Sequence, residues 1–146
     1  MKKELMSWEN CLQEYIKTIQ VDKEKIKSIR KMCAVRQKVT KNIRLDEETA
    51  SVIAENYYEI IKELLVALLN VFGYKSNNHE CLIAFFKNQF PKYEYEIKII
   101  YELKNVRNRI VYDGIFVKKS YLEKNKLEFE HIIELLNKLL DKNLKK

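Results

Sequence analysis

The sequence has little of the two residues that most often interrupt helices. Its 146 residues contain two glycines and one proline. Glycine provides the left-handed conformations of tight turns, and proline ends helices, so their scarcity argues for long helices and few turns. Sustained strand-like alternation, repeats of fixed period and low-complexity linkers are also lacking. These absences favour an all-α protein.

Cysteine is scarce as well, and its spacing suits no metal site. Cys11, Cys33 and Cys81 form no CxxC pair, and only His79 lies near a cysteine at ligand spacing. A zinc site needs more ligands than this. We therefore expect reduced, mostly buried thiols and predict no metal and no other cofactor.

No apolar run approaches the length of a membrane span, and the first residues, MKKELMSWENC, contain no apolar signal core. These features predict a soluble, cytoplasmic protein with no membrane partner. Hydrophobic residues make up 47% of the chain and charged residues 34%, enough for both a core and a solvated surface. A chain of this length is expected to form one domain, residues 1–146.

The formal net charge is +7, from 28 basic and 21 acidic residues. A basic protein of this size can attract phosphate polymers such as RNA. The same charge can also be a solvated coat of lysines, for example in the lysine-rich stretches 23–31 and 138–146. Charge alone leaves both interpretations open.

The spacing of apolar residues predicts the helices and their order. Expected helices are 3–20, 23–43, 46–72, 79–89, 92–112 and 119–143. Asp22, Asp46 and either Asn77 or Asn78 are candidate N-caps, and Gly73 and Gly114 are candidate helix ends. Helix 46–72 is apolar around most of its girth, which places it at the centre of a bundle. The fold class is therefore all-α, an antiparallel up-and-down bundle of five to six helices. Its core is about 46–143, with the N-terminal helices 3–43 packed on it.

One stretch, KNVRNRIVYDGIFV at 104–117, combines groups that can bind an anion. Arg107 offers a planar fork of donors suited to phosphate oxygens, and Asn108 can orient a neighbour or a 2′-hydroxyl group. Tyr112 can stack on a base, but as a proton acceptor a phenol is poor because its pKa is ordinarily about 10. Arg109 is a second candidate for substrate contact. The competing interpretation is the solvated last turn of a structural helix.

Helix geometry limits how these residues can cooperate. Asn108 and Tyr112 are four apart and share a face, whereas Arg107 lies about 140° from Tyr112 around a regular helix. They can act on one ligand if the helix frays near Tyr112 or if the arginine side chain reaches round. A second copy of the helix facing the first would also bring them together.

Two stretches together resemble the HEPN domain family. ETASVIAENYYEIIKELLVALLNVFGYKSNNHECLIAFF, residues 48–86, resembles the double-tyrosine helix, glycine turn and His-containing short helix of these domains. LKNVRNRIVYDG, residues 103–114, resembles the family signature of an arginine, a polar residue and a histidine four to six positions after the arginine. By position, Arg107 and Asn108 match the first two, and Tyr112 occupies the place of the histidine.

The resemblance implies a helical bundle, usually a two-fold dimer. Many family members are metal-independent ribonucleases, often toxins paired with a small nucleotidyltransferase-type protein. It therefore implies an RNA-binding or endoribonuclease-like module with Arg107, Asn108 and Tyr112 as the catalytic set, and with catalysis weakened or lost because Tyr112 replaces the histidine. The alternatives are a non-catalytic partner of a nucleotidyltransferase-type protein and a nucleotide-binding module. The expected partners are a second copy, such a protein, or RNA.

Other residues are interpreted from their surroundings in the sequence. His79 opens a helix, where a neutral imidazole can cap or pack, and it is also a candidate substrate-binding residue. Tyr57 and Tyr58 are expected in the core, Trp8 as an anchor of the first helix, and His131 as a partly exposed helix residue.

Overall fold

This computed structural model describes residues 4–145. Within them lie six α-helices, one short 3-10 helix and two strands of two residues each. In chain order they are α1 (Trp8–Glu14), β1 (Lys17–Thr18), α2 (Lys23–Lys41), α3 (Ala50–Val71), β2 (Tyr74–Lys75), α4 (His79–Gln89), η1 (Pro91–Tyr93), α5 (Glu94–Asp113) and α6 (Lys119–Leu144). The predicted all-α class is confirmed.

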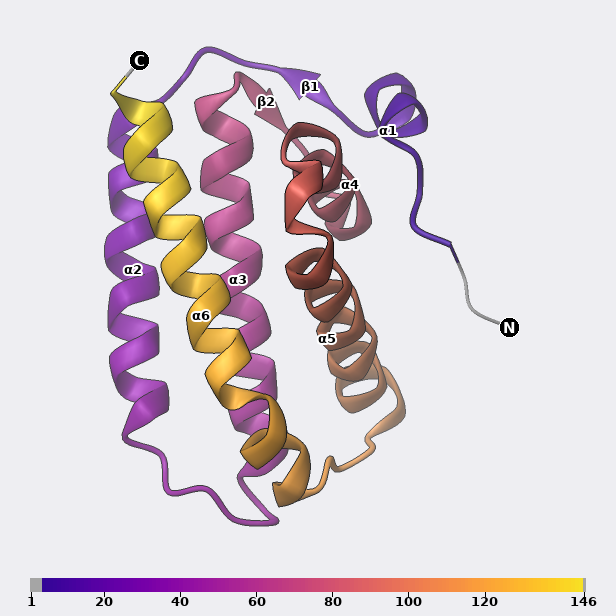
Figure 1. The fold of residues 1–146 in the computed structure, drawn as a ribbon, viewed down its shortest axis with the longest axis vertical. Coiled ribbons are helices and arrows are strands. Elements are labelled where there is room, and N and C mark those ends of the chain that lie inside the picture. Colours follow the sequence, from indigo (N-terminus) through magenta and orange to yellow (C-terminus); the bar gives the residue numbers. More distant parts are fainter. Residues whose placement is uncertain (1–3, 146) are drawn as a thin grey trace.

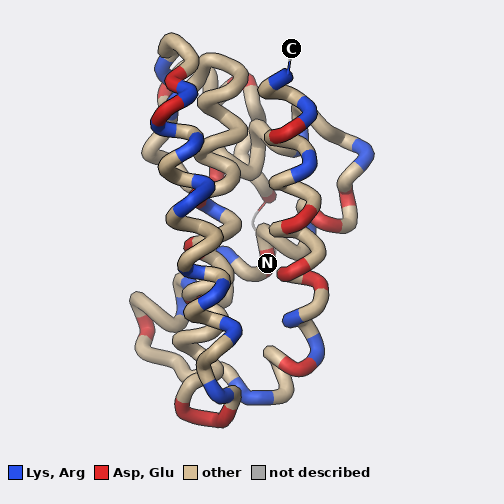
Figure 2. Tube along the Cα trace, turned by 90° about the vertical axis from the view of Figure 1, so that its left-hand side faces the viewer, with Lys and Arg blue, Asp and Glu red and all other residues tan. Residues whose placement is uncertain are grey.

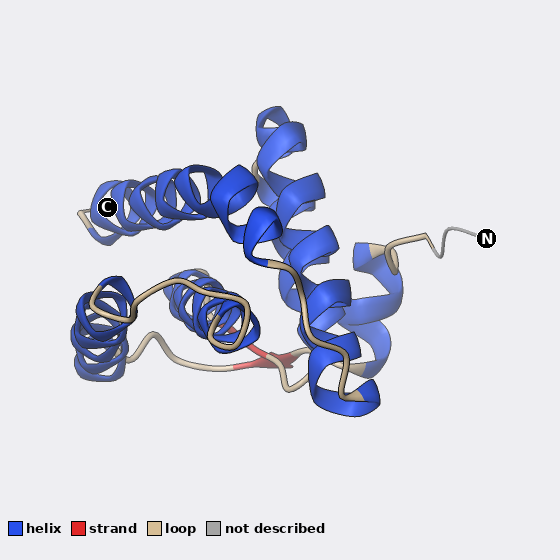
Figure 3. Ribbon diagram, turned by 90° about the horizontal axis from the view of Figure 1, so that it is seen from below, coloured by secondary structure: helices blue, strands red, loops and turns tan. Residues whose placement is uncertain are grey.

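Four long helices form an up-and-down bundle. Figure 1 shows α2, α3, α5 and α6 alternating in direction, with α4 and α1 beside the upper part of α5. Seen from below, α2 lies at one edge of the bundle, and α4 with α1 lies at the opposite edge (Figure 3). None of the helices in residues 4–145 is both long and apolar enough to cross a membrane.

Helix α3 is the centre of the core, as its wide apolar surface predicts. Fourteen of its 22 residues are buried, and they face α2, α5 and α6 at once. Tyr57 and Tyr58 are among them, in agreement with their expected core positions. Helix α2 differs, because only Ile26, Cys33 and Thr40 are buried, each seven residues after the last. This narrow contact face makes α2 a peripheral helix.

The predicted helix ends are largely confirmed. Asp22 Oδ1 accepts the Lys25 N–H at 3.0 Å, and Asn78 Oδ1 accepts the Cys81 N–H at 3.1 Å. Gly114 follows α5 with a φ of +64°, a conformation that side chains with a Cβ rarely adopt. Asp46 caps a turn instead of α3 itself, since its carboxylate accepts from the N–H groups of Glu48 and Thr49.

The prediction of one helix over 3–20 is wrong. Helix α1 spans only Trp8–Glu14, and the chain then extends into β1, which pairs antiparallel with β2. The Ile19 N–H donates to the Gly73 carbonyl at 2.9 Å and continues this contact. Apolar spacing misled here because only part of the apolar series is helical. Trp8 lies in α1 and packs against Tyr74 and Phe85, whereas Ile16 and Ile19 belong to the extended segment that follows.

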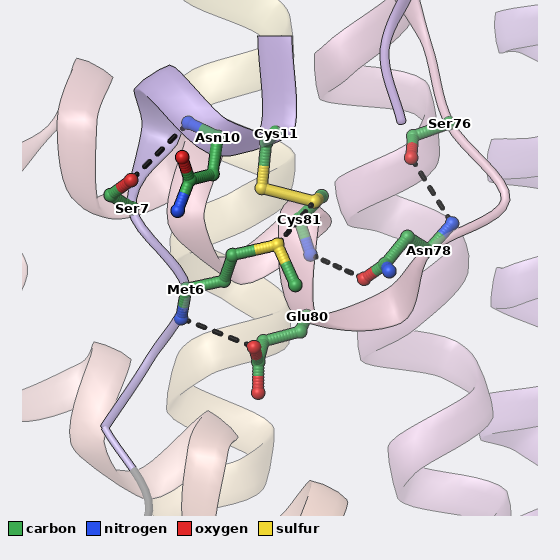
Figure 4. Close-up of a disulfide and its surroundings, with 8 residues drawn as sticks. All are labelled: Met6, Ser7, Asn10, Cys11, Ser76, Asn78, Glu80 and Cys81. Carbon is green, nitrogen blue, oxygen red and sulfur yellow. Dashed lines mark hydrogen bonds between the residues drawn. A yellow bond between two sulfur atoms is a disulfide. The ribbon is translucent and has the colours of Figure 1, made fainter. Parts of the chain in front are cut away.

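The expectation of three reduced thiols is also wrong. Cys11 of α1 and Cys81 of α4 form a disulfide across 70 positions of sequence (Figure 4). Cys33 is a free, buried thiol, as expected. Sequence spacing could not reveal the pair, because disulfide formation depends on the distance between Cα atoms in the fold. The bond attaches the N-terminal segment to the end of the bundle where α4 begins.

Candidate functional site

A pocket of about 440 Å³ lies between the start of α4 and the second half of α5. It brings together Arg107, Asn108, Tyr112 and His79 of the sequence-predicted residues. Its lining consists of Met6, Asn77, Asn78, His79, Glu80, Lys104, Arg107, Asn108 and Tyr112.

Arg107 and Tyr112 come close together although α5 stays helical at Tyr112. The helix continues to Asp113, and the Arg107 side chain reaches round so that its Cζ lies 5.8 Å from the centre of the Tyr112 ring. The sequence left three ways to bring these residues together: fraying of the helix, reach of the arginine side chain, or a second copy of the helix. The structure shows the second.

Arg107 is held in place from three sides. Its Nη1 donates to Asn108 Oδ1 at 3.2 Å, and its Cζ lies 5.5 Å from the centre of the Tyr58 ring. Tyr58 is fully packed in α3, and Tyr112 lies on the solvent side with 72% of its surface exposed. A guanidinium group between two aromatic faces is attracted to both. The Arg107 side chain is therefore preoriented for an incoming anion. Guanidinium N–H groups that do not donate to Asn108 can donate to that anion.

His79 joins the same pocket from α4 and is tied to Tyr58. The Tyr58 hydroxyl group and His79 Nδ1 are 3.1 Å apart. Burial, followed by the charges of Lys62 and Arg107, lowers the pKa of His79 below its ordinary value. The imidazole is therefore neutral near pH 7. If Tyr58 accepts the Nδ1 proton, the basic atom of the ring is Nε2.

The Tyr58 phenol stays protonated at neutral pH. Burial raises its pKa, and Arg107 only partly opposes this effect. The sequence placed Tyr58 in the core correctly but did not indicate that its hydroxyl group and ring face support two pocket residues. Position 58 is far from both in the chain, so only the packing of α3 against α4 and α5 reveals the contact.

Lys104 is a pocket residue that the sequence could have indicated. It precedes Arg107 by three positions and Asn108 by four, the spacings that place residues on one helix face. Glu80 is the carboxylate of the pocket and accepts the Met6 N–H at 3.1 Å (Figure 4). Two cations against one carboxylate leave the pocket attractive to anions, and it opens at the positive end of the α4 dipole.

Arg109 lies elsewhere. It lines a larger groove of about 1100 Å³ between α5, the 114–118 loop and α6, together with Tyr121 and Lys124. The structure therefore does not bring Arg109 to the pocket of Arg107, which is consistent with two residues of separation on a helix. His131 is exposed on α6, with its Nε2 4.0 Å from Glu96, which agrees with an ordinary surface position.

The described residues show no cluster suited to a metal ion: nowhere in 4–145 do three or more His, Cys, Asp or Glu side chains gather closely enough. The pocket thus combines a fixed guanidinium group, an ammonium group, one carboxylate, a neutral imidazole and an exposed phenol ring.

Comparison with protein-family models, with curated proteins and with solved structures finds no match for this chain.

Proposed function

We propose that the Arg107 pocket binds the phosphodiester backbone of single-stranded RNA and supports slow, metal-independent cleavage. The observation that carries the proposal is the guanidinium group of Arg107, held by Asn108 and lying near both Tyr58 and Tyr112. The resemblance of Arg107 and Asn108 to the HEPN signature supports the same function.

Each pocket group suits one part of a ribonucleotide. Arg107 and Lys104 provide donors for phosphate oxygens, and arginine can make two parallel bonds to them. The exposed Tyr112 ring can stack on a base, as aromatic side chains do in many sites for single-stranded RNA. A pocket of about 440 Å³ has room for a single nucleotide.

His79 is the proton acceptor that Tyr112 cannot be. In the proposed step, His79 Nε2 takes the proton of the ribose 2′-hydroxyl group, and the 2′ oxygen bonds to the adjacent phosphorus. The bond from phosphorus to the 5′ oxygen breaks, and that oxygen takes a proton from water. The hydroxide that remains takes the proton from His79 Nε2, which restores the neutral imidazole. The products are a 2′,3′-cyclic phosphate and a 5′-hydroxyl end. A neutral imidazole is suited to this role at pH 7.

RNA binding is tested with a labelled single-stranded RNA and fluorescence anisotropy. We expect Arg107→Gln to weaken binding about tenfold, as loss of a charged hydrogen-bond donor commonly does. Arg109→Gln is the matched control, since it removes the same charge from the same helix but outside the pocket, and it should change affinity by less than about twofold. Equal losses in both variants would show that net charge, not the pocket, binds RNA.

Cleavage is tested separately in EDTA with the same RNA. The wild-type protein should produce cyclic-phosphate ends, and His79→Gln should remove this activity while binding persists. Binding without any cleavage by the wild-type protein would reject the role of His79 and leave the binding site intact. Cleavage that EDTA abolishes would reject the metal-independent mechanism.

A single nucleotide is the second candidate ligand, because the exposed Tyr112 ring and the size of the pocket suit one base and one phosphate. Adenosine monophosphate should then compete with RNA at millimolar concentration. If it binds tightly on its own and RNA does not bind, the pocket is a nucleotide-binding site.

We also propose that the chain forms a homodimer or a complex with a nucleotidyltransferase-type protein. The support for both partners is the family resemblance. Light scattering of the purified chain and copurification from its native host address these two partners directly.

A further inference from the structure

The positive charge of the molecule is concentrated on one helix. Residues 23–44 contain nine Lys and Arg residues against Glu24 alone, a formal charge of +8, so the rest of the chain carries −1 of the total +7. Figure 2 shows this as a column of basic residues along α2. The column lies at the edge of the bundle opposite α4, away from the Arg107 pocket (Figures 1 and 3). It is therefore a separate surface, and its role lies beyond the proposed function of the pocket.

The outward face of α2 also contains an apolar stripe. This stripe consists of Met32, Val35 and Val39. Together with the polar Ser28 before them, they form a series, here called the α2 seam, whose members follow one another at spacings of four, three and four. Met32, Val35 and Val39 are 55%, 50% and 55% exposed. These spacings place the four residues on one side of a helix, centred about 130° around it from the buried Ile26, Cys33 and Thr40. The pattern is that of the contact positions of a two-helix coiled coil.

Cations flank the α2 seam on both sides. Lys31 and Lys38 precede Met32 and Val39 by one position, and Arg36 follows Val35 by one, which are the positions that border a coiled-coil contact. Glu24 is the single acid near the first turn of this face. A helix docked on the α2 seam would therefore have positive side chains along both of its edges.

This charge pattern selects the partner. Pairing of the α2 seam with a second copy would set Lys31 and Lys38 against Arg36 in a parallel arrangement, or against each other in an antiparallel one, and like charges repel in both. Helices that lie in membrane interfaces commonly bury aromatic or leucine side chains, and the α2 seam has neither. RNA phosphates would pair with the cations but leave the apolar stripe uncovered.

We propose that the α2 seam docks an amphipathic helix of another protein, apolar along one stripe and bordered by glutamate or aspartate. Met32, Val35 and Val39 would pack against the apolar stripe. Lys31, Arg36 and Lys38 would pair with the acidic borders and fix the orientation, because opposite charges across an interface favour one partner over others.

The full-length chain is tested with two designed peptides of roughly three heptads, identical except for their border positions. One has glutamate there and the other has lysine. The glutamate peptide should bind, and added salt should weaken it, whereas the lysine peptide should not bind. If the two peptides bind equally, or neither binds, the proposal is wrong.

Charge reversal provides the control within the protein. A variant with Lys31→Glu, Arg36→Glu and Lys38→Glu should lose about tenfold in affinity for the glutamate peptide and gain affinity for the lysine peptide. Val35→Asp should weaken binding of the glutamate peptide, because it places a charge on the apolar stripe. Circular dichroism and thermal unfolding show that each variant folds, as expected for exposed positions.

The remaining outcomes identify other partners. If the charge-reversed variant loses binding to single-stranded RNA or to phosphatidylserine vesicles, and no peptide binds, the surface belongs to nucleic acid or lipid and the proposal is overturned. RNA binding through the Arg107 pocket should persist in this variant, so failure of one proposal does not imply failure of the other.

Discussion

The ring of Tyr58 is buried in the core, whereas its hydroxyl group reaches His79 and its face lies beneath Arg107. The sequence indicated through the family resemblance that Arg107, Asn108 and Tyr112 belong together, although helix spacing placed only Asn108 and Tyr112 on one face. It did not indicate the contribution of Tyr58 or Glu80, because these residues reach the pocket only through packing of distant segments. Sequence reasoning thus predicted three of the four α5 residues of the candidate site and missed Lys104, and tertiary contacts add the rest.

Tyr112→His should increase cleavage. A second imidazole would protonate the departing 5′ oxygen, a role that water has in the wild-type step, and a well-placed acid accelerates such reactions by about a hundredfold or more. Tyr112→Phe is the control, since it keeps the stacking ring and should show no gain. Rates are measured with labelled RNA in EDTA. Unchanged cleavage by Tyr112→His, with RNA still bound, would contradict the placement of position 112 beside the reacting phosphate.

The lowered pKa of His79 predicts a dependence of stability on pH. In the unfolded chain the imidazole takes a proton near its ordinary pKa of about 6.5, whereas in the folded protein it does so only at lower pH. The unfolded state therefore binds more protons in this range, and the free energy of unfolding falls as the pH is lowered from 7.5 through 6. Urea unfolding at several pH values should show a smaller fall for His79→Gln. An identical fall in both proteins would mean that His79 is not desolvated.

At the scale of elements, the helices with one continuous apolar stripe were predicted well. The ends of α4, α5 and α6 fall within about two residues of the sequence prediction, because a single capping or breaking residue marks most of them. The N-terminal segment was not predicted. Its apolar residues divide between a short helix and an extended strand, and its attachment depends on the pairing of Cys11 with Cys81. Disulfides are rare in the cytosol, so the cytoplasmic location stays a prediction.

Reduction of the disulfide should release the N-terminal segment from α4. A cross-link over 70 residues stabilises by up to about 4 kcal/mol through chain entropy, less if the segment detaches on its own. We expect a lower melting temperature in reductant and faster proteolysis before residue 22, with the long helices protected. Cys33→Ala should keep this sensitivity to reductant, because Cys33 takes no part in the bond. A melting temperature that reductant leaves unchanged would contradict the disulfide.

At the scale of the whole molecule, α3 organises the core and α2 lies at its margin. This division followed from the sequence, since α3 is apolar around most of its girth and α2 is mostly charged. The position of the basic residues in the fold was harder to predict from the sequence. The total of +7 was evident, but only the fold shows that α2 lies at the edge of the bundle opposite α4, away from the Arg107 pocket.

Substitutions in α3 should therefore lower the free energy of unfolding much more than substitutions on the exposed face of α2. Leu64→Ala in α3 empties a fully buried position and should lower the free energy of unfolding by about 2–5 kcal/mol. Val39→Ala, on the exposed face of α2, should change it by less than about 0.5 kcal/mol. Chemical denaturation measures both. If both substitutions lower the free energy of unfolding by a similar amount, the exposed face of α2 is buried in solution and the account of α2 as a peripheral helix is wrong.

The central claim is that RNA binds at the start of α4 and the second half of α5. An NMR titration of the amide signals with a short single-stranded RNA tests it most directly. The largest shifts should fall within residues 77–80 and 104–112 and should be lost in Arg107→Gln. Largest shifts along 23–41, or none anywhere, would contradict the proposed site.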